Sequence, residues 1–131
     1  MTRKLQPFVL AFALALCLVR AAAAPPAGIW DGTVNGAKAA TVTIAEKDGV
    51  LRGSAVFYII RDNGNGAHNG DPQPAQEMKS VEWDGQTLRF TVADSNGAPA
   101  GFVMRLTGEG TAELRARSGK PDVIAQMRRR P

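Results

Sequence analysis

Hydrophobic and polar residues alternate with a period of two along most of the chain after residue 27, which is typical of β-strands that bury one face. In the segment 86–94, Leu88, Phe90 and Val92 share one face, and polar or charged residues occupy the other. Turn sequences rich in Gly, Asn and Asp separate such segments, because these residues tolerate the positive φ of hairpin turns. The pattern shows no helical period and predicts eight strands, at residues 28–35, 39–47, 50–61, 77–84, 86–94, 100–108, 111–117 and 122–129.

Short connections place strands that are neighbours in sequence next to each other in space. We therefore expect an all-β fold: a single antiparallel meander of about eight strands, closed or nearly closed into an up-and-down barrel, because closure removes exposed strand edges. A two-sheet β-sandwich has the same alternation and is the alternative. The expected inward residues are bulky, so the interior is either filled or leaves room for a ligand at its mouth; they include Trp30, Phe57, Trp83, Phe90, Phe102 and Met104.

The first 23 residues have the three-part pattern of a secretory signal peptide. Arg3 and Lys4 give a positive start, residues 8–19 form an unbroken apolar run, and the alanines at 21–24 form a small-residue exit. The apolar run is shorter than the roughly 20 residues that span a bilayer. We expect cleavage after residue 23, which leaves 24–131 as a single β domain in the periplasm or the medium, with no membrane span.

Removal of this leader changes the chemistry of the chain. It takes away Cys17, the only cysteine, so the domain has no disulfide and depends on core packing. It also takes three of the 16 basic residues and none of the 12 acidic ones, which leaves a net charge of +1. Charges of both signs alternate along the remainder, and the arginines at 128–130 have the character of a solvated tail. We therefore expect no nucleic-acid partner.

Gly28-Ile29-Trp30 opens the first predicted strand. Together with the strand count and the export signal, this tripeptide resembles the start of the calycins, the superfamily of small ligand-binding barrels that includes lipocalins and avidin. In calycins the tryptophan packs at the closed end of the barrel, commonly under an arginine of the last strand. The resemblance implies that Trp30 closes this barrel, with Arg128 or Arg130 stacked on its ring. The second lipocalin motif, around Thr-Asp-Tyr, is absent from the sequence.

Two neighbouring segments break the alternation. The run 56–60 is apolar or aromatic on both faces, which indicates either a strand covered on both sides or an exposed patch for a ligand or partner. As an edge, it would also recruit another chain by strand addition. The connection 62–75 follows it and is long enough to be a functional lid or a plain solvated loop. Tyr58, Ile60 and His68 are the residues that we expect to bind a ligand or partner at this mouth.

No catalytic centre is recognisable in the mature sequence. His68 is the only histidine, and with no remaining cysteine the chain lacks the Cys/His set of a typical zinc site. No serine lies in a nucleophile motif, and no glycine-rich loop leads into a helix, so we expect no metal and no cofactor.

These observations favour an exported, monomeric, non-catalytic β-barrel that binds a small apolar or amphipathic molecule. One alternative is an envelope protein-interaction or inhibitor module that uses the 56–60 strand and the 62–75 loop. The other is an uncharacterised enzyme in which His68 takes part.

Overall fold

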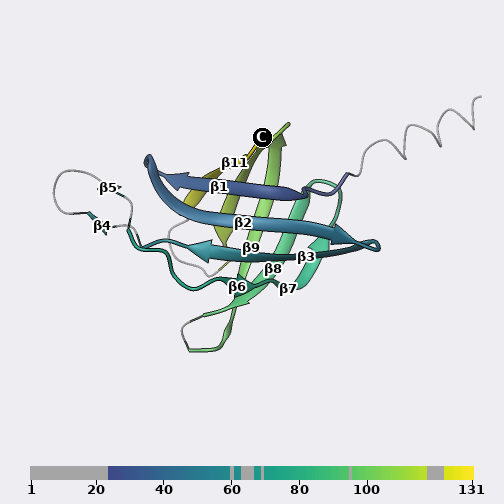
Figure 1. Cartoon of the computed structure of the whole chain (residues 1–131), viewed down its shortest axis with the longest axis horizontal. Coiled ribbons are helices and arrows are strands. Elements are labelled where there is room, and N and C mark those ends of the chain that lie inside the picture. The colour runs from purple at the N-terminus through teal and green to yellow at the C-terminus, as the bar shows by residue number, and fades with distance from the viewer. Residues whose placement is uncertain (1–23, 60, 63–66, 69, 95, 118–122) are drawn as a thin grey trace, which may run out of the picture.

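The computed structural model describes residues 24–59, 61–62, 67–68, 70–94, 96–117 and 123–131. The predicted leader, 1–23, lies outside these described residues. Within them, nine strands form one antiparallel sheet that curls into a nearly closed barrel (Figure 1). The barrel strands are β1 (Gly28–Val34), β2 (Ala37–Lys47), β3 (Val50–Phe57), β6 (Gln76–Glu77), β7 (Lys79–Trp83), β8 (Thr87–Ala93), β9 (Pro99–Gly108), β10 (Thr111–Ala116) and β11 (Ile124–Arg129). A separate two-stranded ladder joins β4 (Arg61–Asp62) to β5 (Ala67–His68).

The order of strands confirms the expected up-and-down barrel. It runs β6-β3-β2-β1-β11-β10-β9-β8-β7, so the first strand of the chain pairs with the last. Only Met78 separates β6 from β7, and the two together act as one interrupted strand, which brings the ring to the eight strands predicted. In Figure 1, β1, β2 and β3 cross the front wall, and the green and yellow strands run steeply behind them. A single curled sheet excludes the sandwich alternative.

The hairpins fall where the turn sequences predict them. Asn35 and Gly36, between β1 and β2, have φ of 51° and 81°, and Asp48 and Gly49, between β2 and β3, have φ of 54° and 77°. Positive φ at both central residues is the conformation of a type I′ turn, whose twist matches that of the strands on either side.

Alternate side chains of the strands fill the interior. The fully buried ones include Trp30, Leu88, Phe90 and Met104, each at most 2% exposed. The other bulky residues expected inside, Phe57, Trp83 and Phe102, are partly buried and pack against this core.

The ring closes where β3 meets the interrupted strand. Here β3 pairs with β6 through Ser54 and Ala55, and the Met78 amide donates a hydrogen bond of 2.9 Å to the Gly53 carbonyl. The Met78 side chain is 5% exposed and lies over Gly53, where a Cβ would stand 2.8 Å from its sulfur. The absence of a side chain at Gly53 therefore makes room for Met78 where the ring closes.

The predicted strand 50–61 is shorter than expected. β3 ends at Phe57, and Tyr58 makes a single bridge to Pro72. Tyr58 and Pro72 face each other as a non-hydrogen-bonded pair, and this isolated bridge does not extend into a ladder. The segment 71–73 nonetheless covers the edge of β3, because Gln73 N–H donates to the Phe57 carbonyl at 2.7 Å and Ile59 N–H to the Asp71 carbonyl at 3.2 Å.

Gly53→Ala should lower the free energy of unfolding by about 1–3 kcal/mol, the usual cost of overpacking, because the new methyl group meets both the Thr43 carbonyl oxygen and the Met78 sulfur. Chemical denaturation monitored by circular dichroism measures the change. Ser54→Ala, at the next position of the same strand, is the control and should stay within about 0.5 kcal/mol of the wild type. Equal effects of the two substitutions would contradict this account of the seam.

Candidate functional site

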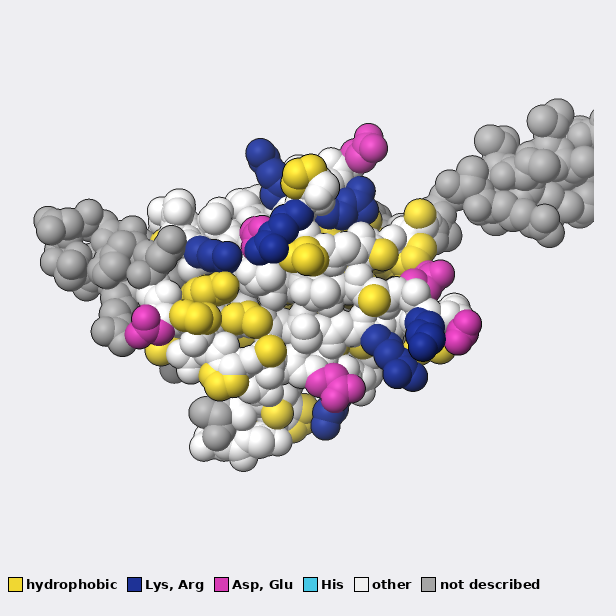
Figure 2. Space-filling model, viewed as in Figure 1, with side chains coloured by type: hydrophobic (Ala, Val, Ile, Leu, Met, Phe, Trp, Pro, Cys, Tyr) yellow, Lys and Arg dark blue, Asp and Glu magenta, His cyan; other side chains and the backbone are white. Residues whose placement is uncertain are grey.

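One end of the barrel holds an open apolar cavity of about 230 Å³. It lies where β1, β3 and β10 end and where β2, β9 and β11 begin, because antiparallel neighbours bring these ends to the same rim. In Figure 2 hydrophobic side chains gather at the left-hand end, where β3 ends in Figure 1, with basic side chains above them. The lining consists of Val34, Ala39, Ala40, Phe57, Tyr58, Phe102, Leu114, Ala116, Val123 and Ala125.

A β-bulge in β2 shapes one wall of the cavity. Gly32 of β1 lies opposite Ala40, and the next residue, Thr33, lies opposite Lys38, so Ala39 has no partner of its own in this pair. A bulge of this kind lets two successive residues face the same side of a sheet. Ala39 and Ala40 accordingly both line the cavity, and their short side chains leave it open.

Stacked aromatic rings form the inner boundary of the cavity. The Phe57 ring lies 4.9 Å from that of Phe102, centroid to centroid, and Phe102 lies 5.7 Å from Phe90. Phe57 comes from β3 and Phe102 from β9, which are not neighbours in the sheet, so the stack crosses the interior. Offset aromatic stacking at these distances favours this arrangement beyond simple burial.

The three residues expected at the mouth have different placements. Tyr58 lines the cavity, and the ammonium of Lys38 lies 5.0 Å from the centre of its ring. Ile60 lies outside the described residues. The backbone of His68 pairs with Arg61 in the β4–β5 ladder, which extends beyond the end of β3 at the left of Figure 1.

Trp30 is buried towards the opposite end of the barrel, where a hollow of about 410 Å³ opens beside Pro25 and Trp83. The Trp30 ring is 1% exposed, and its indole N–H donates a 3.0 Å hydrogen bond to the carbonyl of Pro26, which is itself buried. The guanidinium over the ring, 5.3 Å from its centre, belongs to Arg129. A Cβ on Gly28 would lie 3.0 Å from Arg129 Cδ, so the glycine of Gly28-Ile29-Trp30 makes room for this arginine.

The register of the first and last strands explains which arginine reaches Trp30. Trp30 lies opposite Arg129, and Asp31 lies opposite Arg128. Because alternate residues of a strand point to opposite faces, Arg129 shares the face of Trp30 while its two neighbours take the other face. The arginine over the ring is therefore Arg129, and the prediction of Arg128 or Arg130 was wrong by one position.

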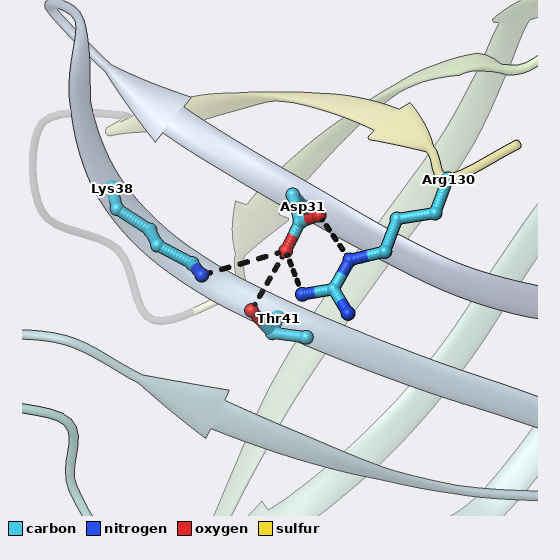
Figure 3. Close-up of polar contacts among 4 residues, drawn as sticks. All are labelled: Asp31, Lys38, Thr41 and Arg130. Carbon is cyan, nitrogen blue, oxygen red and sulfur yellow. Dashed lines mark hydrogen bonds and ion pairs between the residues drawn. The ribbon is translucent and has the colours of Figure 1, made fainter.

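Arg130 instead forms an ion pair that joins the last strand to the first. Its guanidinium donates to both carboxylate oxygens of Asp31, at 2.6 and 3.0 Å (Figure 3). The Thr41 hydroxyl donates to the same carboxylate at 3.0 Å, and the Lys38 ammonium lies 3.7 Å from it. These partners, Arg130 first, lower the pKa of Asp31, and partial burial works against them. Sequence reasoning did not identify this cluster, since no pattern along the chain links positions 31 and 130.

Two kinds of feature, a cluster of metal ligands and a membrane-spanning helix, were sought among the described residues. No group of three or more His, Cys, Asp or Glu side chains there is placed to hold a metal ion. No helix in the described part of the chain is long and apolar enough to cross a membrane.

The molecule is a small, nearly closed antiparallel barrel with an apolar cavity at one end and a buried tryptophan towards the other. Comparisons of the chain with protein-family models, with curated proteins and with solved structures found no match. The resemblance to calycins therefore stays a prediction.

Arg129→Ala should lower the free energy of unfolding by about 1 kcal/mol, because the cation is removed from the face of a buried indole. Arg128→Ala is the matched control and should change the stability less, since Arg128 lies on the other face of the strand. Urea denaturation of both variants measures the difference. If the two substitutions cost the same, the contact with Trp30 adds nothing to stability.

Asp31→Asn should reveal an acid-dependent contribution to stability. A carboxyl whose pKa is lowered on folding stabilises the native state above its ordinary pKa, about 3.9, and this contribution disappears as the pH falls through the lowered value. Thermal melts should show the variant less stable than the wild type near neutral pH, with the gap closing in strong acid. Glu46→Gln, on the exposed end of β2, is the control. A gap that persists unchanged into strong acid would contradict the prediction.

Proposed function

We propose that this protein is an exported, non-catalytic β-barrel that binds a small apolar or amphipathic molecule in the open end of the barrel. The observation that carries the proposal is the cavity of about 230 Å³. The leader pattern at 1–23 supports export.

The size of the cavity limits the ligand. Sites for drug-sized molecules usually measure about 300–1,000 Å³, and this one is smaller. It suits a short acyl chain, a single ring system, or the apolar end of a longer molecule whose remainder stays in solvent. The stacked rings of Phe57 and Phe102 give such a group an aromatic surface to contact.

Polar groups at the rim favour an amphipathic ligand. The Tyr58 hydroxyl is the polar group of the lining, and Lys38 lies over the ring of Tyr58. A few polar groups at the edge of an apolar site commonly set the orientation of a ligand. A molecule with an apolar tail and an acidic or hydroxylated head matches this arrangement.

A protein-interaction or inhibitor module is the second candidate, and exposed hydrophobic residues at the same end favour it. Val123 is 64% exposed and lines the cavity mouth, and Ile59, next to Tyr58, is 44% exposed. A partner would bind these side chains rather than add a strand, because the segment 71–73 covers the end of β3.

Filling the cavity should weaken ligand binding without unfolding the barrel. Ala39→Leu places a branched side chain in the cavity wall, whereas Ala45→Leu makes the same change at an exposed position of the same strand. We expect the fluorescent apolar probe N-phenyl-1-naphthylamine to bind Ala45→Leu as it binds the wild type. We expect Ala39→Leu to bind it at least about tenfold more weakly, the factor that corresponds to about 1.4 kcal/mol. Circular dichroism checks that both variants are folded.

The outcomes separate the two candidates. Equal probe binding by the two variants would exclude the cavity as the site. Native mass spectrometry of the protein from its own host identifies what the cavity holds: a discrete added mass supports the small-ligand barrel, and a second polypeptide supports the interaction module.

A further inference from the structure

A second groove lies on the outer wall of β8, β9 and β10, away from the apolar cavity. Its volume is about 410 Å³, and its lining is Thr87, Arg89, Val103, Arg105, Glu113 and Arg115. The intervening residues of the same strands, such as Leu88, Met104 and Leu114, are buried inside the barrel. The groove therefore belongs to the opposite face of the sheet, and a ligand in the cavity does not touch it.

The strand register gathers three arginines that are distant in sequence. Arg89 and Arg115 both lie opposite Val103, one on each neighbouring strand. Two interstrand spacings of about 4.8 Å place their Cα atoms roughly 10 Å apart. Arg105 lies two residues further along β9, so the three form a triangle with Val103 between them.

A single carboxylate within the groove does not neutralise these charges. Glu113 lies 3.6 Å from Arg105 and 3.7 Å from Arg115, distances longer than a hydrogen bond. The side chains of these two arginines remain 55% and 42% exposed. Arg89 pairs with Asp84 at 3.3 Å and is 42% exposed. Several guanidinium N–H groups therefore face solvent around one groove.

The positive charge continues along the wall beyond the groove. The Arg117 side chain runs beside Gly101 of β9, where a Cβ would lie 3.1 Å from its Cδ, and Arg128 of β11 lies opposite Thr111. Glu82 of β7 lies opposite Arg89, and Asp31 of β1 lies opposite Arg128, so carboxylates border the wall on both sides, while within the groove three arginines face the one carboxylate of Glu113. Such a surface attracts and orients an anionic partner.

We propose that this wall docks an acidic segment of a partner protein, with side-chain carboxylates bound by Arg89, Arg105 and Arg115. The planar guanidinium fork matches a carboxylate, and Val103 offers a contact for the aliphatic part of an acidic side chain. The lining, as the described residues define it, holds no aromatic ring on which a nucleic-acid base would stack. The large hydrophobic residues most exposed among those described lie outside it, so insertion into a lipid surface is less favoured; they are Ile29, Val50, Ile59 and Val123.

Fluorescence anisotropy with a labelled oligoglutamate peptide tests the proposal, with oligoglutamine of the same length as the neutral probe. We expect the purified protein to bind oligoglutamate alone, and more weakly as ionic strength rises. Arg89→Gln combined with Arg115→Gln should weaken binding at least about tenfold, since it removes two of the three guanidinium groups that would bind the carboxylates. Arg52→Gln, an exposed arginine on β3 outside the groove, should leave binding within about twofold, as a distant surface change does.

Glu113→Gln gives a result of the opposite sign. It removes the carboxylate that competes for Arg105 and Arg115, so oligoglutamate should bind more tightly. Weaker binding by a folded Glu113→Gln variant would overturn the proposal, as would equal binding by the double variant and the wild type. Tighter binding to oligothymidylate, to phosphatidylglycerol vesicles or to pyrophosphate would assign the wall to another anion. The Ala39→Leu variant leaves the groove intact, so failure of the cavity proposal and failure of this one are distinguishable.

Discussion

The interior of an eight-stranded barrel has room for little more than its own side chains, and the rest of this structure depends on how large and small residues share that space. Trp30, Phe90 and Met104 fill much of the interior and are almost fully buried. Ala39 and Ala40 stand at one end, where their short side chains leave the cavity open. Large inward side chains thus fill one part of the barrel, and small ones leave a cavity at one end. The proposed ligand site depends on this difference.

The fold was predictable because its signals are local. Alternation with a period of two marks each strand, and Asn-Gly or Asp-Gly marks each of the first two hairpins. Strand ends were less accurate where distant residues decide them. β3 ends at Phe57, and Tyr58 beyond it bridges to Pro72, a partner of which the run 56–60 contains no sign.

The sites were less predictable because they depend on register between strands. Arg129, rather than one of its neighbours, contacts Trp30 because the strands pair residues about a hundred positions apart. The bulge at Ala39 also depends on how β2 lies against β1. Charges of both signs alternate along the sequence. Across β8, β9 and β10, however, the same residues place three arginines around one glutamate, an arrangement that only the folded sheet reveals.

The pairing of β1 with β11 has a consequence for the order of folding. The partner of Trp30 lies at Arg129, so the ring stays open until nearly the whole chain is available. Contacts of such large sequence separation form late, because a long loop must close before they contribute any stability. Until then the edges of β1 and β10 are exposed and can pair with strands of other chains. If the chain is exported unfolded, as we propose, its last strand would be the last to cross the membrane, and this topology would delay closure of the barrel until then.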